Sequence, residues 1–308
     1  MLRLAAVRLL TSLVVVFGSL VLVFVVVYLL PGDPVSAVVD VSAVSPEVLA
    51  SLRAEMGVDQ PFHIQFFSYV GGVVQGDFGQ SLLNDEPVLP KILQHFPATL
   101  TLTLASALIA ASFGIWFGVL SAIHRNGWID IAARIIGLFG ISMPTFWSGI
   151  LLILIFSVSL GWFPAMGSGS LRTLVLPAFA LGIVGAGFIV RLVRNSMLEV
   201  INEPFILTLR AKGISERLVM YRHALRSALI PALTMIGVLS GELMAGTVVI
   251  ETVFARQGIG RVITDALMSK DLPVVQGVVF FSAVIYVLIN LLVDLSYRFI
   301  DPRVRRAQ

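Results

Sequence analysis

Six long apolar segments limit the fold of this chain more than any other feature of its sequence. They cover Leu9–Leu30, Thr99–Ile123, Ala133–Val158, Thr173–Leu192, Leu229–Ile250 and Val274–Leu295. An α-helix rises about 1.5 Å per residue, so each segment is long enough to cross about 30 Å of hydrocarbon. The alternating pattern of membrane β-barrel strands is absent from the sequence. We therefore predict an all-α polytopic membrane protein with six transmembrane helices.

The composition excludes a water-soluble enzyme. Of the 308 residues, 57% are hydrophobic and 13% are charged, and the mean hydropathy is +0.97. Soluble domains carry about 25% charged residues. The chain has no cysteine, which excludes disulfides, thiolate metal sites and a cysteine nucleophile. The first apolar segment follows Arg3 and Arg8, as in a signal peptide, but it is longer than a signal core, so we favour an uncleaved span.

Lysine and arginine are distributed unequally between the two sides of the predicted bundle. If the N-terminus is inside, 15 of the 21 basic residues lie on the inner side. This excess predicts that both termini are cytoplasmic. Residues 31–97 are then extracytoplasmic, and residues 196–228 form the main cytoplasmic loop of a single transmembrane domain over residues 1–308.

The region 31–97 carries signals for two short helices. Ser45 is a predicted N-cap, Pro46 is the first helical residue, and Gly57 is a C-terminal stop. A second helix is predicted around His63–Val74, where Gly71-Gly72 weakens its end. We expect both helices to lie on the membrane surface or on other loops.

Small residues at four-residue spacing predict tight helix packing. They are Ser106, Ala110, Gly114, Gly118 and Ala122 in the second segment, Ala178, Gly182 and Ala186 in the fourth, and Gly237, Gly241 and Ala245 in the fifth. Membrane helices associate through such residues, either within the chain or with a partner subunit. Pro144 lies in the middle of the third segment and predicts a kink there.

Residues 196–228 contain helix start and stop signals, as a structured loop does. Glu203-Pro204 is a helix-start signal, Gly213 is a stop, and Ser215 is a new N-cap. We therefore predict two short helices that meet at a tight turn beneath the membrane. A plain basic inside loop is the alternative.

Nucleotide-binding and catalytic motifs are absent from the sequence. Without a G-x-x-x-x-G-K-[ST] loop, the chain is not expected to hold ATP itself. The four histidines are scattered, which argues against a metal site, and no G-x-S-x-G elbow occurs. Membrane topology explains the basic residues, so nucleic acid binding has no support. An ATP-independent carrier or channel remains the rival class, although no internal repeat is visible.

Nine short blocks carry a resemblance to a known family. They are Leu30–Pro34, Met56–Pro61, Gly76–Ser81, Ala211–Gly213, Arg222–Arg226, Glu251–Phe254, Gly258–Gly260, Asn290–Asp294 and Asp301–Arg303. Their shared order resembles ABC-transporter permeases of the dipeptide/oligopeptide/nickel branch. The long outer loop before the second span resembles that of the first of the two permeases that such systems pair. The sequence departs from the pattern at Leu207-Thr208-Leu209, where the general motif opens with Glu-Ala-Ala, and at Arg256-Gln257, where Trp-Pro is usual.

The resemblance implies a type I ABC importer permease in a bacterial inner membrane, with an extracytoplasmic subdomain between the first two helices. It implies a second homologous permease, two ATPase subunits that bind ATP and magnesium, and an extracytoplasmic solute-binding protein. This chain itself is expected to carry no cofactor and to contact membrane lipid. Di- and oligopeptides are the implied substrates, with nickel, haem and glutathione as alternatives.

The same resemblance assigns candidate residues. The ATPase-coupling residues are Ala211, Lys212, Gly213, Ser215, Glu216, Arg222, His223, Leu225 and Arg226. The candidate residues of the binding-protein and gate loops are Asp33, Gly76, Asp77 and Glu251.

Glu242, Asn290 and Asp294 are the candidate pathway residues. A charge at the membrane centre costs about 2.5–3.5 kcal/mol on insertion scales, so an intramembrane acid such as Glu242 suggests a function. A structural hydrogen bond or a protonated acid is the alternative for Glu242. Asp294 either reaches water or pairs with Arg298, four residues further on.

Overall fold

The computed structural model describes residues 2–29, 35, 39, 45–55, 57 and 59–300. Among these residues it is helical, apart from turns and one isolated antiparallel bridge between Gln80 and Pro87. The chain divides into two compact units, Met1–Ala98 with Gln257–Leu288 and Thr99–Arg256 with Ile289–Gln308. Two helices, α4 (Val88–Ile123) and α12 (Leu272–Ile300), run through both units. The expected single domain over residues 1–308 stays a prediction.

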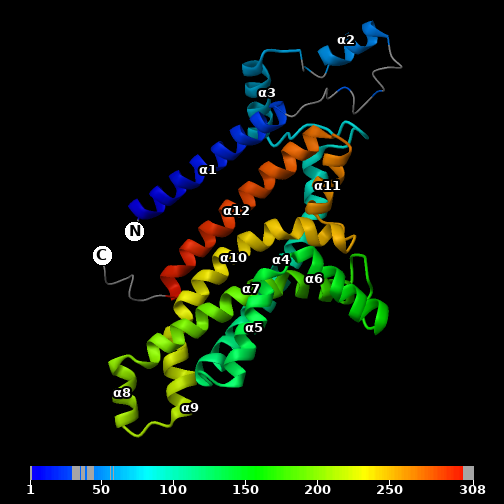
Figure 1. Cartoon of the computed structure of the whole chain (residues 1–308). Helices are drawn as coiled ribbons and strands as arrows, with labels where there is room; N and C mark the ends of the chain where they lie inside the picture. The colour runs from blue at the N-terminus through cyan, green and yellow to red at the C-terminus, as the bar shows by residue number, and fades with distance from the viewer. Residues whose placement is uncertain are drawn as a thin grey trace. The chain divides into compact units, whose positions relative to one another are not determined.

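In the first unit, the end of α1 (Leu2–Leu29) lies beside α3 (Phe62–Val74) (Figure 1). Aromatic side chains pack between the two helices. The ring of Phe24 lies 5.3 Å from the ring of Phe66 and 5.6 Å from that of Tyr69. Such pairs contribute about 0.5–1.5 kcal/mol each beyond the burial of their area. The unit also contains α2 (Pro46–Glu55), α11 (Ile259–Met268) and the first parts of α4 and α12.

Both short helices predicted for the region 31–97 are confirmed. Ser45 caps α2, because its Oγ accepts a hydrogen bond from the backbone N–H of Val48 at 3.4 Å. The chain leaves α2 through Gly57, whose φ of +67° lies in the left-handed region that favours glycine. The α3 helix runs through Gly71-Gly72 to Val74, so those two glycines do not end it.

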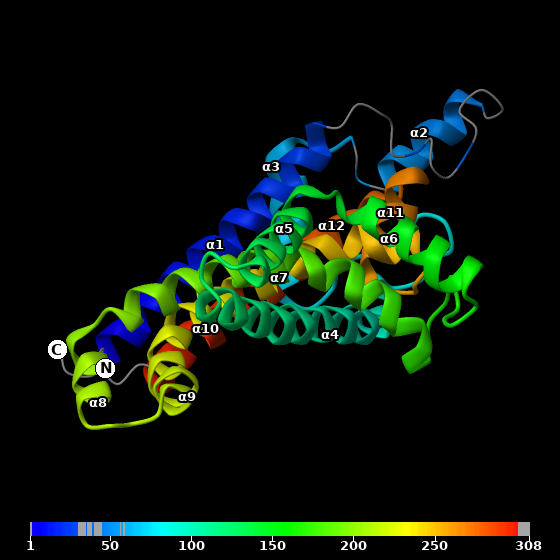
Figure 2. The ribbon, with the colours of Figure 1, turned by 60° about the horizontal axis from the view of Figure 1, so that its bottom comes forward.

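The second unit is built around α7 (Leu171–Ile201), along which α4 runs (Figure 2). A capping box between Ser170 and Thr173 begins α7. The other elements, in chain order, are α5 (Trp128–Ser142), α6 (Thr145–Leu152), the π-helical η2 (Ile153–Ser159), α8 (Pro204–Ala211), α9 (Glu216–Leu218), the π-helical η3 (Val219–Ala224) and α10 (Leu225–Val253).

Five of the predicted spans are single long apolar helices, but the third is broken. In the described residues, α5 and α6 with η2 pass the length and hydropathy requirements only as a pair, bent by 111°. The predicted kink at Pro144 is thus too mild. Met143 is extended at ψ 131°, as the residue before a proline tends to be, and Pro144 is the N-cap of the next helix.

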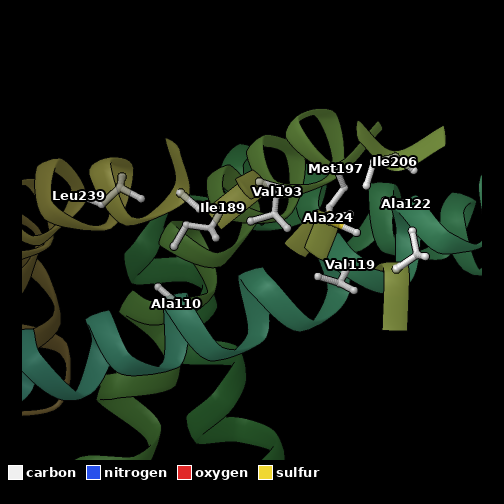
Figure 3. Packing of buried hydrophobic residues seen from close by; sticks show 12 residues of the cluster. Ala110, Val119, Ala122, Ile189, Val193, Met197, Ile206, Ala224 and Leu239 are labelled. Carbon is white, nitrogen blue, oxygen red and sulfur yellow. The ribbon is translucent and has the colours of Figure 1, made fainter. Parts of the chain in front are cut away.

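The small residues of α4 pack against α7 within the chain. A β-carbon on Gly114 would lie 2.5 Å from Cβ of Ile189, and one on Gly118 would lie 2.7 Å from Cβ of Val193. Figure 3 shows the buried cluster that this approach creates, with Ala110 of α4 near Ile189 of α7. Packing within the chain, rather than with a partner subunit, is therefore confirmed for the spaced small residues of α4 and α7.

Two of the three spaced small residues of α10 are buried within the chain. Gly237 is buried against Val293 of α12, and Gly241 is also buried. Ala245, in contrast, is exposed. This end of the set is therefore not covered by the rest of the described chain.

Candidate functional site

The connection between α7 and α10 differs from the predicted pair of short helices. The α7 helix continues to Ile201, well beyond the predicted end at Leu192. Of the two predicted helices, α8 is separate, whereas α9 and η3 join α10 in one helix over Glu216–Val253. The prediction of two independent helices is therefore wrong, because the N-terminus of the fifth span absorbs the second one.

The turn after α8 follows a Schellman motif. Gly213, with φ +74°, donates its N–H to the carbonyl of Arg210 at 2.9 Å, and Ile214 donates to the carbonyl of Leu209 at 3.3 Å. The Nε of Arg210 also lies 2.8 Å from Oε1 of Glu216, so an ion pair bridges the end of α8 and the start of α9. Gly213 is the predicted stop, which is confirmed.

Ser215 begins α9 at the predicted position but not by the predicted capping bond. Its backbone is extended, with ψ 141°, and its hydroxyl makes no capping hydrogen bond. Its carbonyl accepts the first helical bonds, from Leu218 at 2.9 Å and Val219 at 3.0 Å. The position of the helix start was therefore predictable, whereas the side-chain contact was not.

Buried side chains anchor this connection to the transmembrane helices. Ile206 of α8, Val219 and Ala224 of η3 are fully buried in one cluster with Val193 and Met197 of α7. Figure 3 shows Ile206 and Ala224 beside Met197. Since dense packing transmits displacement, a movement of α8 is passed to α7 and to the start of α10.

The outer surface of the connection is both basic and apolar. Ala211, Lys212, Gly213, Ser215, Glu216, Arg222 and Arg226 are exposed, as a coupling surface requires. His223 and Leu225 are half-buried, and Leu225 packs on the cluster, so its role in coupling stays a prediction. Sequence reasoning missed the exposed apolar residues of this surface, which are Phe205, Leu207, Leu218 and Tyr221.

Glu251 does not lie in a loop, so that placement is wrong. It occupies the last turn of α10 and is fully buried. Thr99 of α4 donates its hydroxyl to Oε1 of Glu251 at 2.6 Å. Nearby, the guanidinium of Arg256 donates to the hydroxyl of Thr101 at 3.2 Å. Glu251 thus ties the end of α10 to α4.

Gly76 and Asp77 form the exit from α3. Gly76, with φ +81°, donates to the carbonyl of Val73 at 3.0 Å, and Asp77 donates to that of Gly72 at 2.9 Å. The side chain of Asp77 then accepts a hydrogen bond from the N–H of Gly79 at 2.8 Å. Asp33, the fourth residue proposed for these loops, lies outside the described residues.

The next segment, residues 79–88, is a small hairpin held by a buried acid. Asp271 accepts a hydrogen bond from the hydroxyl of Ser81 at 2.5 Å and one from the N–H of Leu82 at 3.1 Å. Ser81 and Asp271 are both buried. Sequence reasoning missed Asp271, because a lone acid before an apolar helix gives no sign of a partner 190 residues away.

The tip of this hairpin is exposed and acidic. Asp85 adopts a left-handed φ of +55°, and Leu83 is exposed beside it. Hydrogen bonds from the side chains of Asn84 and Lys91 lower the pKa of Glu86 from its ordinary value. The tip therefore stays negatively charged at neutral pH.

The three candidate pathway residues differ in how far the structure describes and buries them. Glu242 is exposed on α10, on the same helix face as Val238, Ala245 and Val249. Asn290 is half-buried on α12, and the side chain of Asp294 lies outside the described residues. Glu242 therefore faces away from the core of its own chain.

A buried ion pair, also missed from the sequence, joins the ends of three helices. Asp130 of α5 is fully buried and accepts hydrogen bonds from Nε and Nη2 of Arg194 in α7 at 2.7 and 2.9 Å. Ser121 of α4 donates to the same carboxylate at 2.5 Å, and the N–H of Asn126 does so at 3.0 Å. In sequence, Asp130 reads only as an acid in the first turn of a helix.

No group of three or more histidine, aspartate or glutamate side chains in the described part of the chain is placed to hold a metal ion. The expectation that ATP and magnesium are bound by other subunits stays a prediction.

Comparisons with known families match nearly the whole chain. Residues 114–306 match the family described as binding-protein-dependent transport system inner membrane component. Residues 1–103 match the family described as the N-terminal part of such membrane components.

Characterised relatives and solved structures agree with this match. The chain is 42% identical over 285 residues to the glutathione transport system permease protein GsiC of Salmonella choleraesuis, covering 92% of this chain and 93% of the relative. It is 40% identical over 317 residues to the di/tripeptide transport system permease protein DppB of Pseudomonas aeruginosa, covering 94% of each. A chain of the inward-facing methionine ABC transporter MetNI superposes with a TM-score of 0.60 at 21% identity, covering 70% of this chain and 99% of that one. This last likeness shows the fold alone.

Proposed function

The chain belongs to the family of binding-protein-dependent transport system inner membrane components, and on that premise we propose that it carries short peptides across the membrane together with a second permease. It is a permease subunit of an ABC importer. One relative is named for glutathione, itself a tripeptide, and another for di- and tripeptides. Peptides of two or three residues are therefore the favoured substrates, ahead of nickel or haem.

The structural observation that supports an ATP-driven role is the surface of the α7–α10 connection. It presents exposed apolar and basic side chains on helices whose other face is anchored among buried residues of α7 and η3. An exposed apolar patch rimmed by charges is typical of a protein–protein interface. We assign this surface to the ATPase subunits, which would push on α8 and thereby on both adjoining helices.

A pair of leucine variants tests the assignment. Leu207 is 66% exposed on α8, and Leu171 is 83% exposed at the opposite end of α7. We expect Leu207→Asp to reduce co-purification of the ATPase subunits about ten-fold or more, because one interface anchor contributes about 2 kcal/mol. Leu171→Asp should leave recovery unchanged. Equal recovery from both variants would show that α8 is a passive connector.

The open face of α10 is the proposed contact with the second permease and the pathway. Val238 and Val249 flank Glu242 on this face, and Ala245 permits close approach of another helix. An acid that faces neither its own core nor a described partner fits a protein-lined pathway, where it would meet the amino group of a peptide. One copy of each permease and two ATPases is the stoichiometry that we propose.

The acidic hairpin tip is the proposed contact with a solute-binding protein. Leu83 supplies an exposed apolar anchor, and Asp85 and Glu86 supply charge. Asp271 holds the hairpin in one conformation, which lowers the entropic cost of docking.

The excess of basic residues supports a position of both termini in the cytoplasm. In that orientation the α7–α10 connection is cytoplasmic, where the ATPases would lie, and the sequence topology makes residues 31–97 extracytoplasmic. Reporter fusions after residue 170 and after residue 213 would test this; activity of a cytoplasm-specific reporter at residue 170 would reverse the assignment.

A further inference from the structure

A groove of about 320 Å³ lies between α5 and α7, apart from the surfaces discussed above. Its walls are apolar and include Leu138, Ile141 and Val190. One end is lined by three arginines, which are Arg134, Arg191 and Arg194. The groove therefore combines an apolar slot with a cationic mouth.

The groove exists because two glycines let the helices cross closely. Gly137 of α5 and Gly187 of α7 lie at the crossing, where a β-carbon on Gly187 would collide with the carbonyl of Gly137. On the same face of α5, a β-carbon on Gly140 would lie 2.6 Å from the carbonyl of Ile183. Both Gly137 and Gly187 line the groove, which therefore lies beside this close crossing.

The mouth carries more positive charge than the protein neutralises. The carboxylate of Asp130 accepts two hydrogen bonds from Arg194, and its Oδ1 lies 3.5 Å from Nε of Arg134. In the described part of the chain, Arg191 has no carboxylate partner, and its guanidinium lies 5.9 Å from the ring centre of Phe188. Three guanidiniums against one carboxylate leave a surplus of two positive charges.

The residues around the mouth support a position near a membrane interface. Trp128, at the first residue of α5, is 77% exposed, as an interfacial anchor would be. Arg134 follows six residues later, about 9 Å along the helix, and its side chain is 53% exposed. From Arg134 to Phe139, the other exposed residues of α5, Leu138 among them, are apolar. Arginines in this position extend toward lipid headgroups.

We propose that this groove binds an anionic phospholipid, with the phosphate on Arg134 and Arg191 and an acyl chain along Leu138, Ile141 and Val190. Basic pockets between transmembrane helices are suited to such headgroups. A soluble phosphate would leave the apolar walls without a partner. A protein chain would have to bring its own acids to two arginines, whereas an anionic lipid supplies both charge and chain. The inference does not depend on the proposed substrate or on the ATPase contact.

Native mass spectrometry of the full chain in detergent tests the proposal, with phosphatidylglycerol and phosphatidylcholine added at equal concentration. We expect the wild type to retain phosphatidylglycerol in preference. The Arg134→Gln/Arg191→Gln variant should lose that preference by roughly five-fold for each arginine removed. The control Arg125→Gln/Arg217→Gln removes two exposed arginines outside the groove, one from the turn between α4 and α5 and one from α9, and should retain it. Arg191→Gln alone, at an exposed position, keeps the test valid if the double variant does not fold.

Three results would overturn the proposal. The first is equal phosphatidylglycerol retention by the wild type, the groove variant and the control. The second is displacement of the lipid by millimolar inorganic phosphate, which would indicate a soluble-anion site. The third uses Leu138→Cys, which introduces a single thiol because the chain has no cysteine. Cross-linking of that thiol to another protein subunit in the assembled transporter would show that protein, not lipid, covers the groove.

Discussion

Replacing Asp271 by alanine should loosen the hairpin of residues 79–88 without unfolding the chain. The carboxylate accepts two hydrogen bonds, from Ser81 and Leu82, and both Ser81 and Asp271 are buried. Hydrogen bonds to a charged group contribute about 1.5–3 kcal/mol each. The cost of burying the carboxylate offsets part of that gain, so we expect a net loss of about 3 kcal/mol.

Hydrogen–deuterium exchange of the purified full chain measures this loss directly. Within the hairpin, Ser81 donates its N–H to the carbonyl of Glu86, and Val88 donates to that of Gly79. About 3 kcal/mol corresponds to an exchange rate roughly 150-fold faster at these two amides, if exchange follows local opening. Asp271→Asn keeps an acceptor for Ser81 and should give a smaller increase.

The control is Asp265→Asn, on the neighbouring helix α11. Asp265 is exposed and lies 3.5 Å from Arg261 in a surface pair, which contributes about 0–1 kcal/mol. Its removal should leave exchange in the hairpin unchanged. Unchanged protection of Ser81 and Val88 in Asp271→Ala would refute the view that this acid holds the hairpin.

Three further variants test the second unit. Gly213→Val forces a left-handed φ on a β-branched residue, at a cost of about 1–2 kcal/mol, and should weaken co-purification of the ATPase subunits. The control is Gly161→Val, also at positive φ but far from α8 in the chain, which should leave co-purification unchanged. Asp130→Ala strands the guanidinium of Arg194 and should lower the stability of the detergent-solubilised chain by about 3 kcal/mol, read from its thermal unfolding. Glu242→Gln should lower peptide uptake per assembled complex in proteoliposomes. Equal uptake rates per complex for wild type and variant, with several peptides, would refute the pathway hypothesis. A fall in the yield of the complex alone would show that Glu242 is a packing residue.

The elements that sequence predicted best are those fixed by local chemistry. Long apolar segments must be helical in a membrane, and single residues such as Ser45, Gly57 and Gly213 set helix ends through their own backbone and side-chain bonds. The small residues at four-residue spacing likewise predicted close packing of α4 and α7, although not that these two helices meet each other. All of these signals lie within a few residues of the feature that they determine.

The features that sequence missed depend on contacts between distant residues. Arg194 pairs with Asp130 across 64 residues, and Asp271 pairs with Ser81 across 190. Pro144 marked the position of the bend, but a proline removes one helical bond and predicts only a kink. The 111° break arises because Met143 turns fully extended, so that the proline begins a new helix.

The continuous helix over Glu216–Val253 gives the proposed coupling a physical route. At about 1.5 Å per residue, its 38 residues span about 57 Å. Its first turn is tied to α8 by the ion pair of Arg210 and Glu216, and its last turn is tied to α4 by the bond between Glu251 and Thr99. A push on α8 therefore reaches the far end of α4 only if this helix stays stiff between the two ties. Its weak points are the π-helical η3 and Pro231, both near the driven end, so the long stretch that carries Glu242 moves as one body.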